Sequence, residues 1–152
     1  VAFGAEVTVL STSPTKEADA KELGAHHFVV TKDATQLANV VGSFDFILDT
    51  VSAPHDINMY LSLLKTNGIH ICVGVPPTPY DLHAFSLIGG RKSLVGSLIG
   101  GLPETQEMLD YCAANNIVSE IEIIDIKDIH AAYDRMLKGD VRYRFVIDMA
   151  TL

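Results

Sequence analysis

The sequence predicts an α/β protein built on a doubly wound parallel sheet with helices on both faces. Short apolar runs without strict alternation recur along the chain, as is typical of strands that are covered on both sides. Segments with helical spacing, each with its own start and stop residues, separate these runs. With 152 residues, 48% of them hydrophobic and 20% charged, the chain is expected to form one domain with a sizeable core.

The first predicted strand, residues 7–10, runs into a polar turn that begins a helix. Ser13 is placed to accept hydrogen bonds from the first free amides of that helix, and Pro14 suits its first position. Gly24 is the expected stop. Residues 1–4 before the strand have the pattern of the last turn of a helix that ends in glycine.

Alternation of strands and helices continues to the end of the chain. The next predicted strand is 25–30, and a helix from Asp33 to Val41 follows it, with Gly42 as its stop. The strand after that is 44–48, and it is followed by a helix that Pro54 opens and Asn67-Gly68 ends. The later predicted strands are 69–75, 93–98, 121–124 and 144–148, and the later helices are 82–88, 103–114 and 128–138. The helix 128–138 has the clearest apolar stripe, formed by Ile129, Ala132, Tyr133, Met136 and Leu137.

The polar turn at residues 11–16 has a composition that suits a phosphate. In a dinucleotide-binding fold the end of the second strand faces the adenosine ribose, where an acidic residue would bind the 2′-hydroxyl of NAD. This turn has no acid and offers three hydroxyls and one positive charge, from Ser11, Thr12, Ser13 and Lys16. Such donors favour the 2′-phosphate of NADP. The alternative is that the same residues form only a capped helix start.

Composition argues against two classes of partner. The net charge is −8 and the longest basic run is Arg91-Lys92, so no basic face for nucleic acid is expected. No apolar window approaches the ~20 residues that span a bilayer, and a cytoplasmic location is expected.

The cysteines and histidines predict no metal site. Cys72 and Cys112 form neither a disulfide framework nor a C-x-x-C pair and are interpreted as small buried apolar residues. His70 and Cys72 would point to the same face of a sheet, but two ligands do not complete a zinc site, so a structural role is favoured. No residue is predicted to be catalytic.

Several segments carry a resemblance to the zinc-dependent medium-chain alcohol dehydrogenases, specifically to their cinnamyl alcohol dehydrogenase branch. They are GAEVTVLSTSPTK, ELGAHHFV, FDFILDTVSAPH, LLKTNGIHICVGVP, GSLIGGLPETQEMLDYCA and DVRYRFVID, and they cover nearly the whole chain. The resemblance implies a Rossmann-like NADP-binding domain fragment at residues 1–152, without the first strand and glycine-rich turn, which would precede Val1. The catalytic zinc domain of the family would also lie outside this chain.

The resemblance also assigns cofactor contacts. It places Ser11, Thr12, Ser13 and Lys16 at the 2′-phosphate, and Thr50 and Val51 under the cofactor. Val73, Gly74 and Val75 would face the nicotinamide, and Ser97, Leu98 and Ile99 would lie along its carboxamide. Arg144 would contact the pyrophosphate, with Arg142 as the nearby alternative. Gly74 and Gly96 would permit close approach of the backbone, or serve only as turn residues.

Two hypotheses of function follow. The first is that the chain is the cofactor-binding part of an alcohol dehydrogenase that uses NADP and, in the intact parent, zinc to interconvert primary alcohols and aldehydes. The resemblance also implies a homodimer in which Ser93 to Leu98, at the edge of the sheet, pairs with its twin, and such a dimer would cover an apolar edge. The second is a free-standing, non-catalytic module that binds a nucleotide or a partner. The lack of a central strand weighs against the second, since it leaves backbone groups of two strands unpaired.

Overall fold

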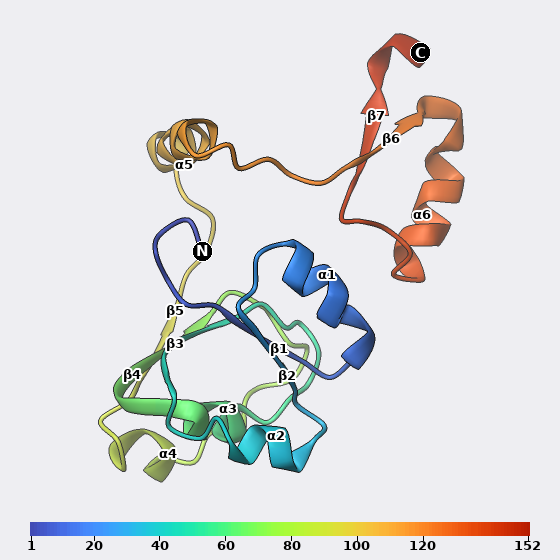
Figure 1. Cartoon of the computed structure of the whole chain (residues 1–152). Helices are drawn as coiled ribbons and strands as arrows, with labels where there is room; N and C mark the ends of the chain where they lie inside the picture. The colour runs from blue at the N-terminus through green and yellow to red at the C-terminus, as the bar shows by residue number, and fades with distance from the viewer. The chain divides into compact units, whose positions relative to one another are not determined.

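The computed structural model describes residues 1–152 as two compact units, Val1–Ile99 and Gly100–Leu152 (Figure 1). Both units alternate strands and helices, as the sequence predicts. All strand pairs are parallel. None of the helices combines the length and the apolar character that crossing a membrane would require.

The first unit holds two separate parallel sheets. β1 pairs with β2 in one sheet, and the order in the other is β3-β4-β5. The elements in chain order are β1 (Thr8–Ser11), the 3₁₀ turn η1 (Pro14–Lys16), α1 (Glu17–Glu22), β2 (His27–Val30), α2 (Ala34–Ala38), β3 (Phe44–Asp49), α3 (Ile57–Leu63), β4 (Leu64–Cys72), α4 (Phe85–Ile88) and β5 (Ser93–Gly96).

The second unit contains one parallel strand pair, β6 with β7. Its elements are α5 (Leu102–Ala114), β6 (Glu122–Asp125), η2 (Ile126–Asp128), α6 (Ile129–Leu137), β7 (Phe145–Asp148) and η3 (Met149–Thr151). Gly101 precedes α5, and its amide donates to the Glu104 carboxylate at 2.9 Å. Glu104, an acid in the first turn, therefore stabilises the start of the helix.

The sheet of the first unit is interrupted between β1 and β3. β1 pairs only with β2, and β3 pairs only with β4. This is the place where the sequence interpretation puts the lacking strand of the doubly wound order. The edge strand β3 also exposes one apolar face, because Phe46 and Leu48 keep 65% and 64% of their surface exposed.

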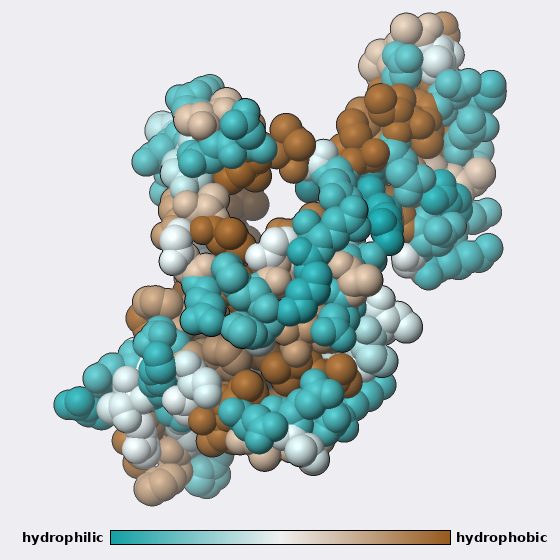
Figure 2. Space-filling model, in the orientation of Figure 1, coloured by the Kyte–Doolittle hydropathy of each residue, from teal (hydrophilic) through white to brown (hydrophobic).

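The core of the first unit is formed by the buried side chains of Ile47, Ile57, Leu61, Leu63 and Leu64. Leu10 and Leu94 pack against this cluster from β1 and β5, so both sheets contribute to it. The core is smaller than the chain length suggests, and Figure 2 shows apolar residues at the surface of both units.

Several predicted boundaries are wrong. Asn67-Gly68 lie inside β4 instead of ending a helix, β4 ends at Cys72 and β5 ends at Gly96. Pro54 does not open α3; Asp56 does, by accepting the amide of Asn58 at 2.9 Å. Leu64 is not in that helix but begins β4, where it pairs with Phe44. Ser13 precedes the first turn without capping it, because its Oγ lies 2.8 Å from Thr15 Oγ1. The predicted stop at Gly24 is confirmed by its φ of 94°.

Asp33 caps α2 as predicted and makes this helix sensitive to acid. Its carboxylate accepts the amides of Thr35 and Gln36 and the side-chain amide of Gln36, and these bonds hold its pKa below the ordinary 3.8. The contribution of this cap to the stability of the folded chain is present above pH 3.8 and is lost as the pH falls through the lowered pKa of Asp33.

We expect the Thr35 and Gln36 amides to exchange faster with solvent in Asp33→Ala than in the unchanged chain at neutral pH, measured by NMR. Asp33→Asn should keep the cap and remove the pH dependence; equal exchange in all three chains would contradict the assignment.

Candidate functional site

The carboxyl ends of three parallel strands lie in register in the first unit. Asp49 of β3 pairs with Cys72 of β4, and Cys72 pairs with Gly96 of β5. In open parallel sheets, ligands bind just beyond this edge. The predicted cofactor residues that follow these strands are Thr50, Val51, Val73, Gly74, Val75, Ser97, Leu98 and Ile99.

Backbone hydrogen bonds hold these three loop starts together. The amides of Val73 and Gly74 both donate to the Asp49 carbonyl at 2.9 Å. The Val75 amide reaches Ser52 Oγ at 3.3 Å, and the Ser97 amide donates to the Cys72 carbonyl at 3.1 Å. The structure therefore brings together the predicted residues of the three loops.

Gly74 is the tightest point of this edge. A Cβ atom on Gly74 would lie 2.4 Å from the Val51 carbonyl oxygen and 2.7 Å from the Thr50 carbonyl carbon. Glycine is required here because the loop after β3 packs directly on its backbone. Gly96 differs, since the nearest atom to its added Cβ would be the Cys72 oxygen at an ordinary 3.6 Å.

The 11–16 turn begins at the last residue of β1, and two of its polar residues, Ser11 and Ser13, are half-buried. The Ser13 amide donates to Ser11 Oγ at 3.2 Å, which fixes the turn at the strand end. Thr12 and Lys16 are exposed, and the Lys16 ammonium makes no ion pair in the structure. The turn thus has an available cation and several hydroxyls, which is the donor set that a phosphate needs.

The two arginines assigned to the pyrophosphate lie in the second unit. Arg144 precedes β7, is exposed, and its carbonyl accepts the Glu122 amide at 3.0 Å. The Arg142 amide donates to the Glu122 carboxylate at 3.2 Å. The role of Arg144 toward a cofactor stays a prediction.

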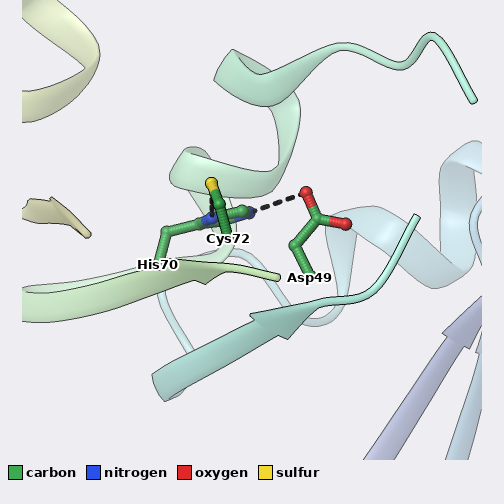
Figure 3. Close-up of side chains that lie close together, drawn as sticks. All are labelled: Asp49, His70 and Cys72. Carbon is green, nitrogen blue, oxygen red and sulfur yellow. Dashed lines mark hydrogen bonds and ion pairs between the residues drawn. The ribbon is translucent and has the colours of Figure 1, made fainter. Parts of the chain in front are cut away.

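Sequence reasoning missed a buried polar cluster behind the ends of β3 and β4. Asp49 Oδ2 accepts His55 Nε2 at 2.9 Å and the Tyr80 hydroxyl at 3.3 Å, and Asp49 Oδ1 accepts the Val51 amide at 2.9 Å. His70 is fully buried, with Nε2 3.9 Å from Asp49 Oδ2 and without a hydrogen-bond partner (Figure 3). Cys72 Sγ lies 3.7 Å from His70 Nδ1, so the predicted common face of these two residues is confirmed.

Burial controls the ionisation of this cluster. It lowers the pKa of His70, which outweighs the opposing effect of the Asp49 charge, and it raises the pKa of the Cys72 thiol. Burial, followed by the Asp49 charge, raises the pKa of Tyr80 to about 12. The pKa shifts of His70, Cys72 and Tyr80 therefore all favour the uncharged form of each side chain.

A family model described as "Zinc-binding dehydrogenase" matches residues 1–114. The chain belongs to this family. Cinnamyl alcohol dehydrogenase 2 of Arabidopsis thaliana is 54% identical over 150 residues, which are 98% of this chain and 40% of that relative. The probable formaldehyde dehydrogenase AdhA of Bacillus subtilis is 51% identical over 99% of this chain and 43% of its own length. The zinc-binding dehydrogenase chain therefore spans about two fifths of the length of these relatives.

Solved structures of related zinc-binding dehydrogenases have the same fold. A cinnamyl alcohol dehydrogenase from Sorghum bicolor matches with a TM-score of 0.91 and 42% identity, over 98% of this chain and 42% of that one. The cinnamyl alcohol dehydrogenase of Helicobacter pylori, solved with NADP(H), matches with a TM-score of 0.82 and 39% identity over the same shares. The Rossmann-like fold and the resemblance to the cinnamyl alcohol dehydrogenase branch are confirmed.

The family description raises the question of whether this chain holds zinc ligands. Asp49, His70 and Cys72 each offer one ligand atom, all within 4.8 Å of one another, and carboxylate, imidazole and thiolate are the groups that bind zinc. A catalytic zinc keeps one position open to substrate, whereas His70 and Asp49 are 0% and 6% exposed. The cluster fits a closed metal site and does not fit a catalytic one.

Proposed function

We propose that this chain is the NADP(H)-binding part of a zinc-dependent alcohol dehydrogenase that transfers hydride between NADP(H) and a primary alcohol or aldehyde. In this proposal residues 1–152 belong to the cofactor domain, and the catalytic zinc is held elsewhere in the parent protein. Relatives named cinnamyl alcohol dehydrogenase, and aldehyde reductase YahK of Escherichia coli at 50% identity, support the substrate class.

The observation that carries the proposal is the 11–16 turn at the carboxyl end of β1. It has hydroxyls and the exposed Lys16 where an NAD-binding domain would place an acid. The Helicobacter pylori relative solved with NADP(H) supports the same cofactor. Ser11, Thr12, Ser13 and Lys16 would hold the 2′-phosphate.

The strand-end loops would hold the rest of the cofactor. Thr50 and Val51 would lie beneath it, Val73 to Val75 would face the nicotinamide, and Ser97 to Ile99 would bind the carboxamide through backbone groups. Bound NADPH supplies the hydride, and the role of these residues is to position the nicotinamide and exclude water.

The same proposal includes a homodimer formed through Ser93 to Leu98 and a cytoplasmic location. β5 is the outer strand of its sheet, and Val95 and Leu98 are 44% and 87% exposed. An apolar sheet edge of this kind needs a cover, which a second copy supplies. Leu94 is a poor position for testing the dimer, since it packs against the core.

The test is a titration of the chain with NADPH and, separately, with NADH, followed by nicotinamide fluorescence at low salt. We expect NADPH to bind at least tenfold more tightly than NADH. Lys16→Ala should weaken NADPH about tenfold and leave NADH unchanged, because a charge-assisted bond to phosphate contributes about 1.4 kcal/mol at an exposed site. Lys138→Ala, which removes an exposed lysine of the second unit, is the matched control. Equal affinities for the two cofactors would refute the proposal.

A further inference from the structure

We propose that Asp49, His70 and Cys72 form a closed zinc site beneath the carboxyl ends of β3 and β4, separate from the cofactor surface and from the catalytic zinc of the parent enzyme.

The spacing of the ligand atoms is close to that of a zinc site. With zinc–ligand bonds of about 2.0 to 2.3 Å, tetrahedral geometry holds neighbouring ligand atoms about 3.3 to 3.6 Å apart. One atom from each of the three residues lies within 4.8 Å of the other two, and His70 Nε2 is 3.9 Å from Asp49 Oδ2. Zinc binding at Nε2 requires the Cys72 and Asp49 side chains to rotate so that the longest separation closes by up to about 1.5 Å, and it moves Cys72 Sγ away from His70 Nδ1, which it faces at 3.7 Å.

His70 is the independent sign of a ligand. Its side chain is fully buried and its Nε2 has no hydrogen-bond partner, although buried polar atoms are nearly always paired. Figure 3 shows this nitrogen directed at the Asp49 carboxylate from the neighbouring strand. A metal ion between the two would bond directly to His70 Nε2, which the protein itself brings only to an ion-pair distance of 3.9 Å from Asp49 Oδ2.

The surrounding groups complete the site. His55 Nε2 lies 2.9 Å from the same Asp49 oxygen but is not one of the three clustered ligand atoms, so its ring, which packs edge-on against Tyr60 and Tyr80, would have to move inward to supply a fourth ligand. The Tyr80 hydroxyl orients the Asp49 carboxylate, as outer partners of metal ligands do. A zinc ion with one carboxylate and one thiolate has no net charge, which suits a buried position.

The experiment titrates the reduced 152-residue chain with Co²⁺ in place of zinc and records the thiolate-to-cobalt charge-transfer absorption. One Co²⁺ per chain should bind, and Zn²⁺ should displace it and abolish the band. His70→Leu and Cys72→Ala should each weaken binding at least tenfold. The matched controls Cys112→Ala and His130→Leu remove the other thiol and an exposed imidazole, and both should bind as the unchanged chain does.

Thermal melting separates loss of a ligand from loss of the fold. In EDTA, His70→Leu should melt at or above the temperature of the unchanged chain, because an apolar side chain replaces an unpaired polar one. Zinc should raise the melting temperature of the unchanged chain and of the two controls only. If His70→Leu does not fold, the test rests on Cys72→Ala, which should lose the thiolate–cobalt absorption band that the unchanged chain shows. The proposal is overturned if the unchanged chain shows no thiolate–cobalt band, or if both ligand variants bind like the controls.

Discussion

Gly74→Ala is expected to abolish detectable NADPH binding and to lower the free energy of unfolding by at least about 2 kcal/mol. The added methyl would lie 2.4 Å from the Val51 oxygen, so the backbone after β3 and the backbone after β4 would have to separate. That movement also breaks the bonds that Val73 and Gly74 donate to the Asp49 carbonyl. Both loops are proposed to contact the cofactor, which is why binding and stability should fall together.

Gly96→Ala is the matched control for this change. It adds the same methyl to a glycine at the same sheet edge, where the nearest atom is 3.6 Å away. Cofactor titration and thermal melting of both variants, side by side, give the comparison. An alanine at position 74 that binds NADPH as tightly as the alanine at position 96 would show that the close approach of the two loops is not needed.

Ser11→Asp is expected to reverse the cofactor preference. Ser11 ends β1, and its Oγ already accepts the Ser13 amide at 3.2 Å, a bond that an aspartate carboxylate can also accept. The turn should therefore keep its shape while its charge changes. A carboxylate there binds the ribose hydroxyls of NADH and repels the 2′-phosphate, so NADPH affinity should fall about 100-fold and NADH affinity should rise.

Ser11→Asn tests whether charge or size causes the reversal. Asparagine has nearly the same shape as aspartate and no charge, so it should retain the preference for NADPH. The measurement is the ratio of the two dissociation constants in each chain. If aspartate and asparagine change the ratio equally, the turn does not face the 2′-phosphate.

Local sequence signals predicted most of the fold. The strand at Phe44–Asp49 and the cap at Asp33 depend on nearby residues, which is why pattern and capping rules located them. Leu64 was misplaced because its apolar character fits both the stripe of α3 and the start of β4. Its assignment depends on pairing with Phe44, which is a long-range contact and leaves no local pattern.

The candidate site, like the fold, could be predicted from the sequence only in part. The family resemblance assigned the Val51 and Gly74 loops to the cofactor surface, but the clash that makes Gly74 necessary depends on the folded path of another loop. His70 and Cys72 could be placed on one face by the period of a strand. Asp49 lies next to these two residues because β3 and β4 pair in a parallel register that places it beside Cys72, and this register cannot be read from the local sequence. An acid at the end of one strand and a His-x-Cys pair near the end of the next is the signal that could have revealed the cluster.

Asp49 joins segments that are otherwise separate along the chain. Its carbonyl accepts the amides of Val73 and Gly74, and its carboxylate accepts the amide of Val51 and the side chain of His55. No one of these amides can become free without disturbing the residue that holds the others. We therefore expect the rim of the sheet to open as one cooperative unit, with concerted movements of both loops instead of independent fraying of each.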